Sequence, residues 1–223
     1  MCGRFALTTP MDAVAEHFAS TPRPGLPDGP RYNICPTQTI ATVRLEEGAR
    51  ALAPMRWGFV PRWAKALDDG PLLINARAET IAEKPAFREA ARRSRCLVPA
   101  SGFYEWSAGA GKGKDPWWVR PVAGGPIAFA GVWRRWEGPE GPVDTVAIVT
   151  CPANGPLSAV HHRMPVVIPP ERYGLWLGEE GHGAATLMRP AADAFFAMHR
   201  VSRDVNRARD DRPELMAPLA EEG

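Results

Sequence analysis

The amino-acid sequence predicts a mainly antiparallel β protein whose sheet is closed or strongly curved, with a few short helices. From Cys96 onward, short apolar segments such as 127–136 and 143–150 alternate with turn clusters, which indicates such a sheet. The 24 prolines and 21 glycines divide the chain into short segments and disfavour long helices. No linker or internal repeat divides the 223 residues, so we expect one domain.

Two short helices are expected in the first half of the chain. Thr9 is predicted as the N-cap of the first helix, with Pro10 at the first helical position. Pro85 is predicted to open the second helix. Apolar residues at helical spacing should face the core, namely Met11, Val14, Ala15 and Phe18 in the first helix and Phe87, Ala90 and Ala91 in the second.

Short strands are expected in the rest of the chain. The candidates are 39–45, 51–59, 72–74, 96–99, 103–106, 117–120, 127–136, 143–150 and 166–168. The strand at 72–74 should be buried and should present the polar residues 75–80 at its end.

Composition and charge restrict the class of protein. The net charge of +2 and the isoelectric point near 8.4 neither require nor exclude a nucleic-acid partner, so any site for a polyanion must be a local patch. No apolar run is long enough to span a membrane, and Asp12 and Glu16 interrupt any secretory signal, so we expect a cytoplasmic protein. Neither a disulfide scaffold nor a zinc site is expected from the widely spaced cysteines Cys2, Cys35, Cys96 and Cys151.

The second residue of the chain is a cysteine, which acquires unusual chemistry if Met1 is removed. Cys2 would then carry a free α-amine and a thiol, whose ordinary pKa values of about 7.7–8.0 and about 8.5 leave a useful share of each reactive near neutral pH. Such an aminothiol condenses with an aldehyde to an imine, and the thiolate then closes a five-membered thiazolidine ring. The alternative is that Cys2 is an ordinary residue on a loose terminus.

Two further segments carry groups suited to proton transfer. Glu105 stands among aromatic residues in the segment 103–106, where apolar surroundings would raise the pKa of its carboxyl group. If the strand simply alternates, Glu105 instead points to water. His161 and His162 precede Arg163 and an apolar strand, and an imidazole titrates close to neutrality. Adjacent histidines point to opposite faces of an extended chain and have no other ligand at suitable spacing, so no metal is expected.

Taken together and in order, these segments resemble the SOS response-associated peptidase (SRAP) family of abasic-site processing proteins. The resemblance covers almost the whole chain. The matching stretches are Met1–Arg4, Tyr32-Asn33 with Pro36-Thr37, Trp57-Gly58 with Pro61 and Trp63, Asn75–Thr80, Cys96–Trp106, Phe129–Trp133, His161 with Arg163–Pro165, and Val205-Asn206. Cys35 and His162 depart from the family pattern, since the family usually has a small residue at the first position and a single matched histidine at the second.

The resemblance implies an α+β fold, with 1–223 forming a single SRAP domain around a β-barrel-like, mainly antiparallel core and short flanking helices. It implies a protein that senses abasic sites in single-stranded DNA and links their aldehyde to Cys2 as a thiazolidine, with self-cleavage of Met1 and a possible lyase activity. By matching position, Asn75 orients the terminus or the sugar, Glu105 transfers protons, and His161 is a second acid or base. No metal or organic cofactor is implied.

The expected partner is single-stranded DNA containing abasic sites, bound by a monomer that associates with the nucleoid when on DNA. Arg4, Arg77 and Arg163 lie beside the proposed catalytic segments and are candidates for phosphate contacts, which give sequence-independent affinity. Tryptophans so close together in a sequence are usually packed in the core or at its rim, but stacking on bases is the alternative role for Trp57, Trp63 and Trp106.

Two other functions stay open on the sequence alone. A cysteine peptidase acting on other proteins would use the thiol of Cys2 with His161 and either Glu105 or Asn75, and would not need a free α-amine. A non-covalent binder of single-stranded DNA would need only the arginines and tryptophans. A nucleophile at position 2 favours the covalent sensor, because a peptidase gains nothing from placing its thiol next to the α-amine.

Overall fold

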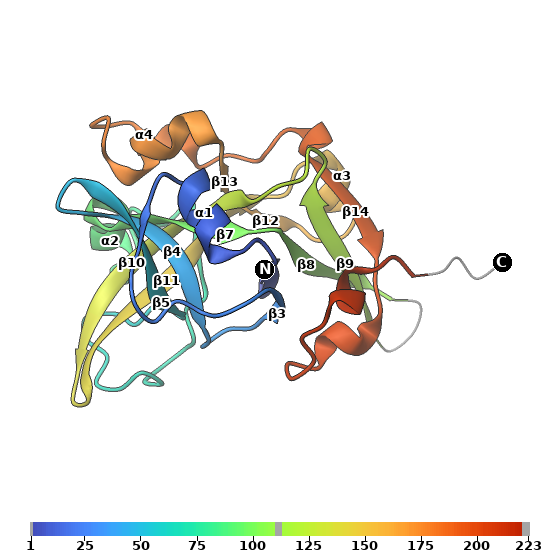
Figure 1. The fold of residues 1–223 in the computed structure, drawn as a ribbon, viewed down its shortest axis with the longest axis horizontal. Coiled ribbons are helices and arrows are strands. Elements are labelled where there is room, and N and C mark those ends of the chain that lie inside the picture. The colour runs from blue at the N-terminus through green and yellow to red at the C-terminus, as the bar shows by residue number, and fades with distance from the viewer. Residues whose placement is uncertain (1, 110–112, 220–223) are drawn as a thin grey trace.

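Two β-sheets organise the chain, which is described here from a computed structural model (Figure 1). The structure describes residues 2–109 and 113–219. The helices are α1 (Met11–His17), α2 (Arg88–Arg93), α3 (Gly155–Ser158) and α4 (Tyr173–Leu177). The strands are β1 (Arg4–Leu7), β2 (Thr21–Pro22), β3 (Arg31–Ile34), β4 (Thr39–Glu46), β5 (Ala49–Trp57), β6 (Asn75–Arg77), β7 (Arg95–Ala100), β8 (Gly102–Ala108), β9 (Lys114–Pro121), β10 (Ile127–Gly138), β11 (Gly141–Pro152), β12 (Arg163–Pro165), β13 (Val167–Ile168) and β14 (Phe196–Arg200).

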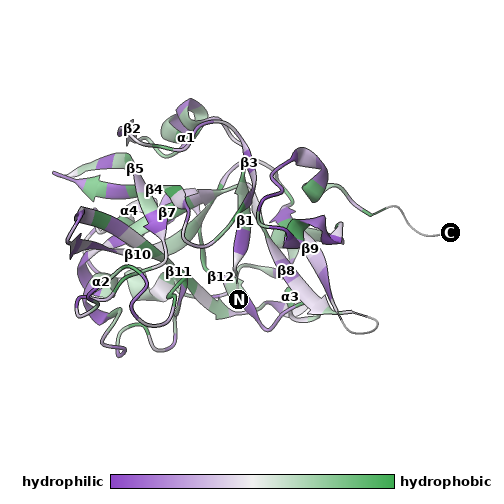
Figure 2. Ribbon diagram, turned by 90° about the horizontal axis from the view of Figure 1, so that it is seen from below, coloured by the Kyte–Doolittle hydropathy of each residue, from purple (hydrophilic) through white to green (hydrophobic). Residues whose placement is uncertain are grey.

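The larger sheet closes on itself as a five-stranded barrel. Its strands follow the order β11-β10-β7-β4-β5, and β5 then pairs in parallel with β11, where Trp57 lies opposite Val146. Hydrophobic and hydrophilic bands alternate along β4 and β5 in Figure 2, as expected for strands with one face in a core. The expected curved, mainly antiparallel sheet is therefore confirmed as a barrel, and closure explains why its strands have few exposed edges.

The smaller sheet has the order β14-β9-β8-β1-β3 and places the start of the chain against the barrel. Figure 2 shows β1 between the barrel strands and the pair β8 and β9. The side chain of Phe5 packs edge-to-face on Trp57 of β5 and on Phe129 of β10, with ring centroids 5.1 and 6.1 Å apart. Ala6, on the opposite face of β1, belongs to a second apolar cluster with Tyr104 and Trp118. Because both faces of β1 are covered, the first strand is a fixed part of the core.

Two short strands pair with the C-terminal part of β11, one on each of its edges, and carry residues of the predicted site. β6 pairs in parallel with β11, with Asn75 opposite Ile148 and Arg77 opposite Thr150. β12 pairs antiparallel with β11, with Arg163 opposite Pro152. Strands β6 and β12, which are far apart in the sequence, are therefore both hydrogen-bonded to β11.

The structure corrects three of the expected boundaries. α1 begins at Met11, and its N-cap is Pro10 in an extended conformation, not Thr9. Pro85 lies in a turn, and α2 begins three residues later at Arg88. The strand expected at 72–74 is instead β6, because the β11 ladder starts at Asn75. The predicted core faces of both helices are confirmed, since each residue named for them is buried or packs partly buried against the core.

Within the described part of the chain, we find no helix with the length and apolar character that crossing a membrane requires.

Phe129 should be a major contributor to stability, because its ring is fully buried between Phe5 and Phe103. We expect Phe129→Ala to lower the free energy of unfolding by about 3–5 kcal/mol, through lost burial and the cavity left behind. Chemical denaturation would measure the change. Val122→Ala, at a side chain that is 59% exposed, should change the same quantity by less than about 0.5 kcal/mol. Equal effects of the two substitutions would contradict the packing described here.

Candidate functional site

Cys2 is completely buried, although it is the second residue of the chain. β1 pairs antiparallel with β8, with Arg4 opposite Tyr104 and Phe5 opposite Phe103. Continuing this register by one residue puts Glu105 opposite Gly3, and therefore beside Cys2. Burial raises the pKa of the Cys2 thiol, and the charge of Glu105 raises it further. The thiol is therefore protonated at neutral pH until a base removes its proton.

Asn75, the first residue of β6, holds the backbone of Cys2. Its side-chain amide Nδ2 donates a hydrogen bond of 3.0 Å to the carbonyl oxygen of Cys2. Its Oδ1 atom is buried and accepts no hydrogen bond from the residues that the structure describes. Buried polar atoms are almost always satisfied, so this oxygen is suited to accept a bond from a group that enters the site. The predicted orienting role of Asn75 stays a prediction, and this geometry supports it.

Glu105 on β8 is almost fully buried, with 1% of its surface exposed. The alternative in which its side chain points to water is wrong for this reason. Desolvation raises the pKa of its carboxyl group to about 7. A carboxyl group with this pKa exchanges protons readily near neutral pH, which suits general acid–base chemistry.

His161 lies directly ahead of β12 and faces Glu105. Its Nδ1 is 3.8 Å from Oε1 of Glu105 and accepts a 3.0 Å hydrogen bond from the backbone N–H of Arg163. The backbone oxygen of Arg163 lies 3.2 Å from the same Nδ1, so both polar backbone atoms of Arg163 orient the ring. Burial lowers the pKa of His161, so the ring is mainly neutral at pH 7 and able to accept a proton.

A cavity of about 300 Å³ opens at these two acid–base groups. It is lined by Glu105, Trp106, Lys114, His161 and Asn206. The indole N–H of Trp106 donates a 2.8 Å hydrogen bond to Oδ1 of Asn206. The cavity has room for a small polar group such as a sugar, and an aromatic ring forms part of its wall.

The segment near Val205 closes this site from the other end of the chain. Arg4 donates to Oδ1 of Asn33 at 2.8 Å and to the carbonyl oxygen of Val205 at 2.6 Å. The Nδ2 of Asn33 donates to the backbone carbonyls of Val205 and Asp210, at 3.2 and 2.7 Å. These bonds tie the beginning of the chain to its end, so Arg4 has a structural task in addition to its predicted phosphate contact.

The other two predicted phosphate-binding arginines are placed differently. Arg77, two residues after Asn75, is exposed and lies on β6 opposite Thr150. Arg163 is buried, and its guanidinium group forms a two-point ion pair with Glu79. Arg77 can reach a phosphate in this conformation, whereas the Nη atoms of Arg163 are already engaged.

The three tryptophans predicted to stack on bases differ in their exposure to solvent. Trp63 is 62% exposed, and Trp106 is partly buried at the cavity, so both offer a face to a ligand. Trp57 is fully buried, and its indole N–H donates to the carbonyl oxygen of Ile74 at 3.0 Å. The stacking prediction for Trp57 is contradicted, because a ring enclosed in the barrel core has no free face.

The structure also distinguishes the residues that depart from the family pattern. His162 is exposed beside His161, with ring centroids 4.3 Å apart, and only His161 lines the cavity. Cys35 is buried, and its thiol donates to the carbonyl oxygen of Asn33 at 3.3 Å. Lys114 was not predicted as a site residue, because nothing in its sequence neighbours reveals that β9 carries it to the cavity. Asn206 could have been chosen, since it belongs to a segment that matches the family.

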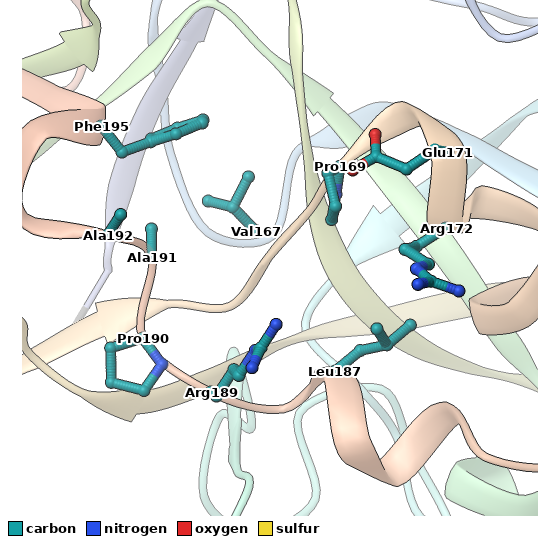
Figure 3. Close-up of a pocket in the computed structure, with 10 residues that line it drawn as sticks. All are labelled: Val167, Pro169, Glu171, Arg172, Leu187, Arg189, Pro190, Ala191, Ala192 and Phe195. Carbon is teal, nitrogen blue, oxygen red and sulfur yellow. The ribbon is translucent and has the colours of Figure 1, made fainter.

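No group of three or more metal-ligating side chains occurs among residues 2–109 and 113–219. A cavity of about 520 Å³, larger than the one at Glu105, is lined by ten residues that include Arg172, Leu187, Arg189 and Phe195 (Figure 3). It shares no lining residue with the cavity at Glu105, and none of its lining residues is a cysteine, serine, threonine, histidine or lysine. We therefore place the candidate active site at Cys2, Asn75, Glu105 and His161.

The barrel and this arrangement define a class of protein with a buried cysteine at position 2 beside a carboxyl group and an imidazole. A family model described as SOS response associated peptidase (SRAP) matches residues 1–208. The chain belongs to the SRAP family, which confirms the resemblance seen in the sequence.

Relatives with established names are similar over nearly the whole chain. The abasic site processing protein YoqW of Bacillus subtilis is 36% identical and is covered over 99% of its length by 97% of this chain. The abasic site processing protein YedK of Escherichia coli is 31% identical, with 98% of this chain and 100% of the relative covered. A crystal structure of a Bacteroides thetaiotaomicron protein superposes with a TM-score of 0.86 at 23% identity, covering 98% of this chain and 100% of that protein, which supports the fold.

The raised pKa of Glu105 predicts a pH-dependent contribution to stability. A carboxyl group whose pKa rises on folding costs free energy once it ionises, so this penalty is absent below about pH 4.5 and grows as the pH rises through about 7. Between pH 5 and pH 8 the unchanged protein should lose this free energy of unfolding, whereas Glu105→Gln should not. The change in free energy of unfolding from pH 5 to pH 8 should therefore be about 1–3 kcal/mol more favourable in Glu105→Gln. Urea unfolding at both pH values would measure this, with the N-terminus of each sample checked by mass. Parallel pH dependences for the two proteins would contradict the raised pKa.

Proposed function

We propose that this protein processes abasic sites in single-stranded DNA by linking the aldehyde of the opened sugar to Cys2, after removal of Met1. The observation that carries the proposal is the burial of Cys2, the second residue of the chain, together with the contact of Asn75 with its carbonyl oxygen and the facing pair of Glu105 and His161. Only a cysteine with a free α-amine can form a thiazolidine, and this one faces groups able to move its protons. The names of the relatives agree with this reaction class.

The reaction balances with the loss of one water molecule. The neutral α-amine of Cys2 attacks the aldehyde carbon, and the resulting carbinolamine loses water to give an imine. The thiol of Cys2 then gives up its proton, the sulfur bonds to the former aldehyde carbon, and the imine nitrogen takes up a proton to give the ring amine. Both nucleophiles belong to one residue, so the second step gains from fixed proximity.

Glu105 and His161 have complementary tasks in these steps. With a pKa of about 7, Glu105 is available both as the acid that protonates the ring oxygen of the sugar and as the base that accepts a proton from Cys2. The neutral ring of His161, 3.8 Å from Glu105, can exchange that proton and assist the loss of water. Because burial and Glu105 raise the pKa of the thiol, imine formation precedes attack by sulfur.

The associated peptidase and lyase activities belong to the same proposal. Met1 lies outside the described residues, and its removal is required before the α-amine exists. The hydrogen bond from Asn75 to the carbonyl of Cys2 holds the backbone next to the bond that must be cut, and Glu105 is the nearby acid or base. An imine that has not yet closed to the ring would also permit β-elimination of the sugar phosphate, which is the lyase reaction.

The DNA would approach along the exposed residues around the cavity. Arg77 is the principal phosphate contact proposed here, and Lys114 adds positive charge at the cavity itself. Trp106 and Trp63 would stack on the bases that flank the lesion. Arg4 contributes through its partly exposed guanidinium group, while a phosphate contact by Arg163 would require Glu79 to give up its place.

Two competing functions make different demands on this site. A peptidase acting on other proteins needs room for an extended peptide, whereas the cavity at Glu105 and His161 has a volume of only about 300 Å³, which suits a single sugar. A purely non-covalent binder has no use for Glu105 buried beside an N-terminal cysteine, which costs free energy. Both observations favour the covalent reaction.

Intact mass before and after incubation with a single-stranded oligonucleotide carrying one abasic site tests the proposal directly. We expect the starting mass to lack methionine and the product to equal protein plus oligonucleotide less one water. Cys2→Ser should form an adduct only when a reductant traps the imine, since oxygen closes a less stable ring. A stable adduct of unchanged yield with Cys2→Ser would exclude the thiazolidine, and loss of methionine without any adduct would exclude the covalent function.

Arg77→Ala should weaken binding evenly across DNA sequences. Loss of one phosphate contact should reduce the slope of log K against log salt by about 0.7 for single strands and raise Kd about 3- to 10-fold. Fluorescence anisotropy with undamaged oligonucleotides at several salt concentrations would measure both quantities. Arg93→Ala, at an exposed arginine on α2, is the matched control and should change neither. A loss confined to particular sequences would contradict a phosphate contact.

A further inference from the structure

The ion pair between Glu79 and Arg163 joins the segment that follows β6 to strand β12. Nη1 and Nη2 of Arg163 are 2.5 and 2.9 Å from Oε1 and Oε2 of Glu79, so the carboxylate binds both ends of the guanidinium fork. The Arg163 side chain is 9% exposed and that of Glu79 is 44% exposed. A two-point pair with one partner buried is stronger and more directional than an ordinary surface pair.

Thr150 of β11 is the common anchor of this pair. Nη2 of Arg163 donates to the carbonyl oxygen of Thr150 at 2.6 Å and lies 3.2 Å from its hydroxyl oxygen. The backbone N–H of Ala78 donates to the same carbonyl oxygen at 2.8 Å. Arg163 on β12 and Ala78, next to Glu79, are therefore joined across a single residue of the barrel.

Each end of this connection leads to a different group of the site. On the β6 side, Asn75 holds the carbonyl oxygen of Cys2. On the β12 side, Nδ1 of His161 lies 3.0 Å from the backbone nitrogen and 3.2 Å from the backbone oxygen of Arg163, so the backbone of Arg163 orients the imidazole. Displacement of Arg163 would therefore change the position of the imidazole relative to Glu105.

We propose that Glu79 is a positioning residue for the chemistry at Cys2, acting through Arg163. By holding the Arg163 guanidinium against Thr150, Glu79 keeps the backbone of Arg163 in contact with Nδ1 of His161 and keeps β6 and β12 at a fixed separation. The inference rests on the proposed function, because the step that it serves is proton transfer between His161 and Glu105.

Two other roles for Glu79 have distinguishable consequences. A carboxylate on a guanidinium fork occupies the place that a DNA phosphate would take, so a Glu79 that competes with DNA would weaken binding. An ion pair at the surface that contributes nothing would leave every measurement unchanged. The buried guanidinium group and the direct bond from the same residue to His161 favour the positioning role.

Glu79→Gln tests the proposal, because it removes the charge and keeps the size of the side chain. We expect the rate of adduct formation at saturating abasic oligonucleotide to fall about 5- to 20-fold, while the Kd for undamaged single strands stays within about twofold. Glu79→Asp, which keeps the charge on a shorter chain, should recover part of the rate. Glu83→Gln, at an exposed glutamate four residues further on, is the matched control and should leave both quantities unchanged.

The chemical shifts of the His161 ring provide a second readout that needs no DNA. Nitrogen-15 chemical shifts of this ring should differ between the unchanged protein and Glu79→Gln, and should be the same in the unchanged protein and Glu83→Gln. If the unchanged protein forms no adduct, the proposed function fails, but the ring shifts still test the positioning role. Tighter DNA binding by Glu79→Gln at an unchanged rate, or an unchanged rate with unchanged ring shifts, would overturn the inference. If Glu79→Gln does not fold, Glu79→Asp decides through the same two measurements.

Discussion

The site depends on one constraint, the burial of the second residue of the chain. A chain end is ordinarily loose, because few contacts offset the conformational entropy lost on ordering it. Here β1 is hydrogen-bonded to β3 on one edge and β8 on the other, and Phe5 is packed into the aromatic core of the barrel. Ordering three residues before Phe5 therefore costs little more. The result is a terminal residue with the positional precision of a core side chain.

Desolvation shifts the protonation equilibria of three groups at the site. It raises the pKa of the Cys2 thiol and of the Glu105 carboxyl group, and it lowers the pKa of His161. Each shift favours the neutral form, as expected when charged groups would lie in a poorly solvated place. Glu105 and His161, which face each other at 3.8 Å, are therefore suited to exchange a proton.

Local patterns in the sequence predicted the parts of the fold that depend on local physics. The apolar spacing of Val14, Ala15 and Phe18 was sufficient to identify the buried face of α1, because a helix repeats every few residues. Trp57 was interpreted incorrectly as a possible stacking residue, because whether an aromatic ring faces the core or the rim is decided by barrel closure between β5 and β11. For the same reason Lys114 was missed. Its place at the cavity follows from strand pairing, which its neighbours in sequence do not encode.

The engagement of Arg163 shows how topology changes the meaning of a residue type. An arginine next to a catalytic histidine suits a phosphate contact, and its sequence neighbours support that interpretation. The strand β11 brings Glu79 and Thr150 to the same guanidinium group from 84 and 13 residues away. Because both Nη atoms of Arg163 are already hydrogen-bonded, binding of a phosphate would first require these bonds to break, which lowers the free energy gained from the phosphate contact. Arg77, exposed on the neighbouring strand β6, has no such cost. In the functions proposed above, attraction of DNA therefore belongs to Arg77 and positioning of His161 to Arg163, and the two arginines lie on opposite edges of β11.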